Sequence, residues 1–122
     1  MKLVVPGRLS GLNEYIAAER THRQKAAKLK HREQERVLGC IRACKLKRCK
    51  QPVFMRYAWY EKDKRRDKDN VSSFGRKVIQ DALVLAGIIP NDGWRWIIGF
   101  SDAFFTDNKN PRIEIEIVEG ES

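Results

Sequence analysis

A strict alternation of apolar and acidic residues constrains the fold of this 122-residue chain more than any other feature. Between Arg112 and Ile117, every second residue is isoleucine and the residues between the isoleucines are glutamates. Because successive side chains of a β-strand point to opposite faces, this segment predicts an antiparallel strand with one buried and one wet face. Such a strand needs neighbouring strands and a covering layer that buries the isoleucines.

Three further segments have the length and composition of strands, namely residues 2–5, 53–60 and 94–100. In the second of these, the odd-numbered residues from Val53 to Trp59 are all apolar or aromatic and would share one face. Pro52 stands at the start of that segment, where proline removes no interior ladder hydrogen bond. The Asn, Asp and Pro residues at 107–111 predict a turn before the last strand.

Two helical segments are expected between the strands. The first runs from Asn13 or Glu14 to about Arg48, and its composition favours helix, but only its two ends are apolar, so its middle should be exposed. The second begins at Asn70 as N-cap and ends at Gly87, before Pro90. Its expected buried residues are Val71, Phe74, Val78, Ile79, Ala82, Leu83 and Leu85.

The fold class that follows is α+β, in the order β-α-β-α-β-β, with the helices packed on one small mixed sheet. A single domain, residues 1–122, suits this length. Within it we expect a long basic helical segment, 14–50, and a sheet-helix core, 52–118, that carries the site.

The positive charge of the chain is concentrated in one segment. Residues 19–50 contain twelve Lys or Arg and three Glu, which accounts for the whole formal net charge of +9. A concentrated basic patch indicates a polyanionic partner. An anionic membrane surface is the alternative, but this segment has too few apolar residues for an interfacial helix. We therefore favour nucleic acid, with Lys25, Lys28 and Arg32 as phosphate contacts.

Other features limit the compartment. The longest apolar stretch, residues 78–89, is short and interrupted, so we expect no membrane-spanning segment. Three cysteines without a secretory signal are typical of a reducing cytoplasm. Cys40, Cys44 and Cys49, with His22 and His31 upstream, could suggest zinc, but zinc sites usually show a second close pair of ligands, so we interpret the cysteines as core thiols.

Two aspartates, Asp67 and Asp69, interrupt a basic run that extends from Lys62 to Asn70. Alternating charges of this kind are common on solvated loops, which is one interpretation. The other is a magnesium site, because carboxylate oxygens are the ligands that this cation prefers. Lys77 lies seven residues after Asn70, about two helical turns at about 100° per residue, and so projects on the same side as Asn70.

Two more acidic residues lie near this helix. Asp81 follows Lys77 by four residues, a spacing that suits either an ordinary surface ion pair or a contact that positions Lys77. Asp92 stands in Asn91-Asp92-Gly93, a sequence typical of turns. Sequence geometry alone does not bring Asp92 to Asp69.

The run 65–70, Lys77 with Asp81-Ala82-Leu83 and Ala86-Gly87, and then Asn91-Asp92 together resemble the signature of the RusA-type Holliday junction resolvases. These are small, homodimeric, Mg²⁺-dependent endodeoxyribonucleases that are often carried by phages and prophages. The resemblance extends from about residue 52 to the C-terminus and is weaker over residues 5–15. Three features depart from the family: the spacing between Asn70 and Lys77 is longer by about one turn, Asn91 is not acidic, and the basic helix is long.

The resemblance implies a site and a reaction. Asp67, Asp69 and Asp92 would bind the metal and act in catalysis, and Lys77 would be a catalytic lysine. The cofactor would be Mg²⁺, with Mn²⁺ as a substitute, and the substrate a four-way DNA junction cut by a homodimer during recombination and repair. The compartment would be the cytoplasm of a bacterial or phage-infected cell. The expected DNA contacts near the site are Arg65, Arg66, Lys68, Asn70 and Arg76.

Two alternatives remain open on the sequence. One is a non-catalytic nucleic-acid-binding protein that uses the basic segment 19–50. The other is a different metal-dependent nuclease, for instance one that acts on RNA.

Overall fold

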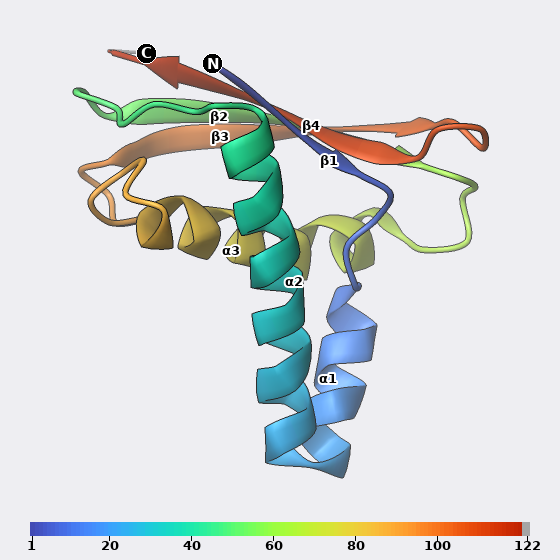
Figure 1. Ribbon diagram of the computed structural model, residues 1–122. Coiled ribbons are helices and arrows are strands. Elements are labelled where there is room, and N and C mark those ends of the chain that lie inside the picture. The colour runs from blue at the N-terminus through green and yellow to red at the C-terminus, as the bar shows by residue number, and fades with distance from the viewer. Residues whose placement is uncertain (121–122) are drawn as a thin grey trace.

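The computed structural model describes residues 1–120 and confirms an α+β fold built on one four-stranded mixed sheet (Figure 1). The strand order across the sheet is β1-β4-β2-β3. β4 runs antiparallel to both of its neighbours, whereas β2 and β3 are parallel. The strands are β1 (Lys2–Pro6), β2 (Val53–Glu61), β3 (Ile97–Thr106) and β4 (Arg112–Glu119).

The alternation of the last strand has the predicted consequence. Ile113, Ile115 and Ile117 are buried, while the glutamates between them face the other side. The same holds in β2, where the side chains from Val53 to Trp59 at odd positions are all buried. Ile115 lies opposite Leu3 on one side and Tyr57 on the other, so the buried residues of three strands form one apolar face.

The helix α3 (Lys68–Leu85) lies along that apolar face and supplies the other half of the core (Figure 1). It approaches the sheet closely at Gly75, where an added Cβ would lie 3.0 Å from the ring of Trp59. Its C-terminal stop is as predicted, because Gly87 adopts the left-handed conformation with φ of 75°.

The basic segment contains two helices, so the prediction of one long helix was wrong. α1 (Leu12–Thr21) and α2 (Arg23–Ala43) lie antiparallel as a hairpin that projects from the layer of α3 (Figure 1). His22 breaks the path with an extended backbone, φ −166° and ψ 125°, and its ring accepts the N–H of Gln24 to cap α2. The break lets α2 fold back against α1, and the element order becomes β-α-α-β-α-β-β.

Three smaller expectations also need correction. The N-cap of α3 is Asp67 rather than Asn70, because the Asp67 carboxylate accepts the N–H of Asn70 (2.9 Å). Leu85 is 64% exposed, since the buried face centres on Gly75, Ile79 and Ala82 and leaves it at the border. The third strand begins at Ile97, three residues late, and extends to Thr106, because it pairs in parallel with the whole of β2.

The hairpin is fixed to the rest of the chain at its base. Glu33 of α2 is buried and accepts the backbone N–H of Ser10 (2.9 Å), just before α1. Arg36 donates to the carbonyls of Pro6 and Arg8 from the same helix. Within residues 1–120, none of the helices has an apolar stretch long enough to cross a bilayer.

Candidate active site

The loop between β2 and α3 is shaped by an internal ion pair. Arg66 makes two parallel hydrogen bonds to the carboxylate of Glu61, at 2.9 and 3.0 Å, and a third to the carbonyl of Leu9 at 3.2 Å. Its side chain is only 12% exposed. Such bidentate pairs are strong and directional. We expected Arg66 to contact DNA. Its side chain is instead occupied within the fold, where it stabilises the loop that places Asp67 at the start of α3.

Asp67 and Asp69 stand together at the N-terminal end of α3. Oδ1 of Asp67 caps the helix, and Oδ1 of Asp69 accepts the hydroxyl of Ser73 (2.7 Å). Both residues are exposed, and within residues 1–120 the other oxygen of each takes part in no hydrogen bond or ion pair. The positive end of the helix favours the ionised carboxylates and an approaching phosphate. The two free oxygens suit a hydrated magnesium ion, which keeps several of its waters.

Lys77 and Asp92 are brought together by the turn after α3. Nζ of Lys77 lies 3.1 Å from Oδ2 of Asp92 and 3.1 Å from Oδ1 of Asp81. The hydrogen bonds that Lys77 donates to Asp92, the larger effect, and to Asp81 raise the pKa of Lys77, and the Lys77 ammonium lowers the pKa of Asp92. Lys77 is therefore a permanent cation at neutral pH, suited to stabilising negative charge rather than accepting a proton.

The predicted site is divided into two groups. Asp69 and Lys77 are eight residues apart on α3, about 12 Å along the helix axis. Within residues 1–120, no three His, Cys, Asp or Glu residues gather as a ready metal site. Asp67 and Asp69 thus form one group with free oxygens, and Asp92 belongs to a second group in which it neutralises Lys77.

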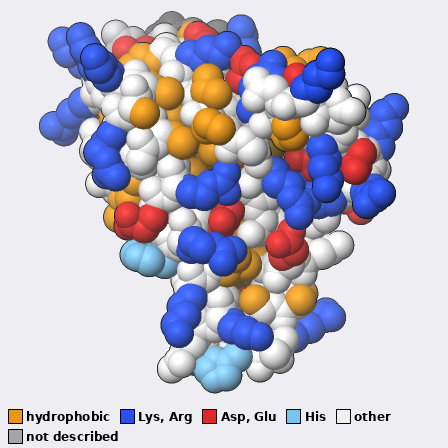
Figure 2. Space-filling view, turned by 45° about the vertical axis from the view of Figure 1, so that its right-hand side comes forward, with side chains coloured by type: hydrophobic (Ala, Val, Ile, Leu, Met, Phe, Trp, Pro, Cys, Tyr) orange, Lys and Arg blue, Asp and Glu red, His pale blue; other side chains and the backbone are white. Residues whose placement is uncertain are grey.

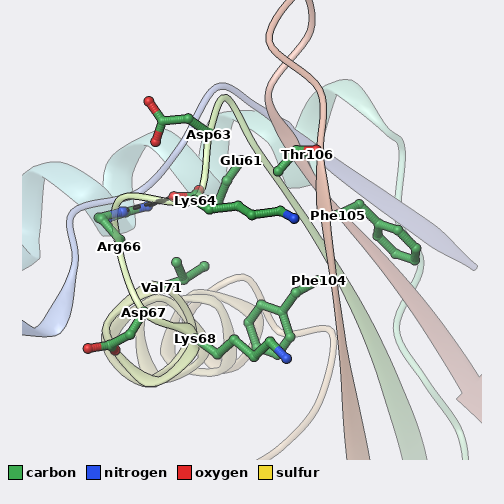
Figure 3. A pocket seen from close by; sticks show the side chains of 10 residues that line it. All are labelled: Glu61, Asp63, Lys64, Arg66, Asp67, Lys68, Val71, Phe104, Phe105 and Thr106. Atoms are coloured by element: carbon green, nitrogen blue, oxygen red, sulfur yellow. Dashed lines mark hydrogen bonds and ion pairs between the residues drawn. The ribbon is translucent and has the colours of Figure 1, made fainter.

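A pocket of 760 Å³ opens beside Asp67 (Figure 3). The loop before α3, the first turn of α3 and the end of β3 supply its walls. The lining residues are Glu61, Asp63, Lys64, Arg66, Asp67, Lys68, Val71, Phe104, Phe105 and Thr106. The sequence interpretation missed Phe104 because it assigned residues 101–106 to no strand, although the aromatic residues there were a signal of one.

The other residues that we expected to contact DNA differ in whether their side chains already have partners within the fold. Arg65 is well exposed, 3.6 Å from Asp63, and Lys68 reaches over the ring of Phe104. Arg76 instead donates to Asp102 (2.7 Å) and lies over Phe100. Asn70 accepts the N–H of Asn13 (2.8 Å) and so joins α3 to α1. Arg65 and Lys68 remain accessible to phosphate, whereas the other two have partners within the fold.

The projecting hairpin carries the remote basic residues. Lys25, Lys28 and Arg32 are exposed and line one open depression together with Ala18 and Leu29. Figure 2 shows Lys and Arg side chains along the narrow part of the molecule and over the broader part above it.

Among the three cysteines, Cys49 agrees most clearly with the interpretation as a core thiol. It is buried, and this burial raises the pKa of its thiol.

No protein-family model matches this sequence, and no curated protein matches it significantly. The likeness to RusA-type resolvases therefore rests on the residues quoted from the sequence.

Proposed function

We propose that the chain is a Mg²⁺-dependent endodeoxyribonuclease that resolves four-way DNA junctions by paired phosphodiester hydrolysis. The observation that carries this proposal is the pair Asp67 and Asp69, each with a free carboxylate oxygen at the start of α3, where Asp67 lines an open pocket. A fixed cation, Lys77, lies farther along the same helix. The proposed setting is recombination and repair in a bacterial or phage-infected cell.

The proposed chemistry divides between cofactor and side chains. Bound Mg²⁺ would polarise a phosphate oxygen and supply an activated water. Asp67 and Asp69 would hold it through their free oxygens. Lys77 lies about 12 Å farther along α3 and is paired with Asp81 and Asp92, so it would have to leave those carboxylates to stabilise charge that develops on the phosphate in the transition state. The family resemblance also assigns Asp92 to the metal, and this role requires its ion pair with Lys77 to open.

Two cuts in a four-way junction call for two equivalent sites, which a symmetric homodimer supplies. β3 offers one surface for such an association, because it is an edge strand of the sheet and leaves Ile98 and Phe105 partly exposed. Exposed apolar residues on an unpaired edge strand favour association with another chain.

The decisive experiment compares three substrates with the purified protein. Synthetic four-way junction, linear duplex and single-stranded RNA are each incubated with Mg²⁺ or with EDTA. We expect paired nicks near the branch point, in the junction alone and only with Mg²⁺. Junction binding without cleavage under any divalent metal would instead favour a non-catalytic binding protein that uses residues 19–50, and cleavage of RNA would favour the third class.

The basic hairpin gives a separate prediction about binding. Neutralising Lys25, Lys28 and Arg32 together should weaken junction binding and flatten its salt dependence. Each phosphate contact contributes about 0.9 to the slope of log K against log salt, so three lost contacts should lower it by about 2.7. Binding titrations at several salt concentrations measure this slope.

A matched control removes the same charge elsewhere. Arg56, Arg95 and Lys109 are also exposed, and all three lie outside the basic segment 19–50. Their neutralisation should change the slope much less. An equal change in both variants would show that binding depends on net charge and not on the hairpin.

A further inference from the structure

The pocket beside Asp67 has an aromatic wall. Phe104 projects into the pocket from β3, and the buried Val71 lies at its base (Figure 3). The neighbouring Phe105 points to the other side of the strand, where it stacks on Tyr60 with ring centroids 4.9 Å apart. β3 is an edge strand, so within residues 1–120 no further strand lies beside Phe104 on that edge, and a base stacked on the ring would take the place of the Lys68 ammonium that lies over it.

The pocket also has two cations that are not neutralised. Glu61 is paired with Arg66, and Asp63 lies 3.6 Å from Arg65. Lys64 and Lys68 take part in no ion pair within residues 1–120, and Nζ of Lys68 lies 5.8 Å from the centroid of Phe104. Asp67 is the one remaining carboxylate, so the unpaired groups of the pocket sum to a positive charge.

An apolar ring beside two cations matches the chemistry of a nucleotide. A base can stack on a phenylalanine while lysines contact its phosphate, which is how single strands are commonly bound. The volume of 760 Å³ lies in the usual range of small-ligand sites. A base inside a duplex is already stacked on both faces, so the occupant must be an unstacked nucleotide.

We propose that this pocket binds one unstacked nucleotide of the strand to be cut, with its base against Phe104 and its phosphate on Lys64 and Lys68. The inference rests on the proposed nuclease function. Asp67 lines the same pocket, with its carboxylate directed away from Phe104 (Figure 3), so a nucleotide held there would lie next to the proposed metal ligands and not on them. Nucleotides at a branch point are less constrained by stacking than those in a linear duplex, so the pocket would contribute to the choice of branched DNA.

The test measures binding without cleavage. Fluorescence anisotropy in EDTA compares a labelled oligothymidylate with an abasic strand of the same length, using the whole chain. Stacking of a base on an aromatic side chain contributes about 1–3 kcal/mol, so the wild-type protein should prefer the strand with bases by roughly tenfold. Phe104→Leu should remove most of this preference, and Phe104→Trp should keep it.

Phe100→Leu is the matched control. Phe100 lies on the same face of β3 as Phe104, also has a cation over its ring, and does not line the pocket. This variant should retain the preference for bases, while Lys64→Ala should weaken binding of both strands alike. Thermal unfolding of Phe104→Leu checks that the fold is kept.

The proposal is overturned if the wild-type protein binds both strands equally, or if Phe100→Leu loses as much preference as Phe104→Leu. These outcomes differ from failure of the nuclease proposal. A protein that prefers bases through Phe104 but cuts no junction retains the pocket and loses the activity. A protein that cuts junctions without this preference retains the activity and loses the pocket.

Discussion

Asp69→Asn is expected to lower junction cleavage with Mg²⁺ by at least about a hundredfold, because loss of even a group that supports a metal ligand costs about 10–100-fold in metal affinity or activity. Asparagine keeps an oxygen that can accept the Ser73 hydroxyl (2.7 Å), so the local structure should persist. What is lost is the negative charge that would hold the metal. Initial rates on a labelled junction under single-turnover conditions measure the effect.

Binding separates this explanation from a structural one. The Asp69 carboxylate repels phosphate, so Asp69→Asn should bind the junction at least as tightly as the wild-type protein in EDTA. Asp63→Asn is the control, because Asp63 lies in the loop just before α3 and lines the pocket beside Asp67 but belongs to neither aspartate group. Equal cleavage by wild-type protein and Asp69→Asn would remove Asp69 from the mechanism.

Trp59→Ala should have the largest effect on stability, a loss of about 3–5 kcal/mol of unfolding free energy. Trp59 is 1% exposed, packs against Gly75 of α3, and donates its indole N–H to Asp102 (2.8 Å). Alanine would leave a cavity between α3 and the sheet and would free the carboxylate of Asp102 from one of its partners. Urea unfolding followed by circular dichroism measures the loss.

Two comparisons sharpen that result. Trp59→Phe keeps a ring in the core and removes only the indole contacts, so its loss should be clearly smaller. Trp94→Ala removes the same side chain from a position that is 98% exposed, and its stability should stay near that of the wild-type protein. A loss for Trp94→Ala equal to that of Trp59→Ala would show that the core lies elsewhere.

The strands β2 and β4 could be predicted because apolar residues stand at every second position, which is the spacing of side chains on one face of a strand. The alternation in β4 and the apolar row of β2 needed no knowledge of the partner strands. The break between α1 and α2 at His22 could not be predicted, because the sequence has no Pro or Gly at that point and each residue there tolerates a helix. The break is stabilised by the packing of α2 against α1 and α3, which is a tertiary contact that local sequence does not specify.

The candidate site was predictable to a similar degree. Asp67 is a good N-cap in its own right, and its preference for that position was available from the sequence. The contact between Lys77 and Asp92 was not, because it depends on how the chain turns after α3. Phe104 entered the pocket through the parallel pairing of β3 with β2, a long-range contact that composition does not encode.

The ties at both sides of α3 have a mechanical consequence. Asn70 is bonded to α1 through Asn13, and Lys30 of α2 lies 3.2 Å from Asp81, so the hairpin is braced against α3 at two points. The hairpin cannot move relative to α3 without breaking one of these two contacts. DNA bound by the hairpin would then lie at a fixed distance from Asp67 and Asp69. This distance would set the position of the cut relative to the bound segment.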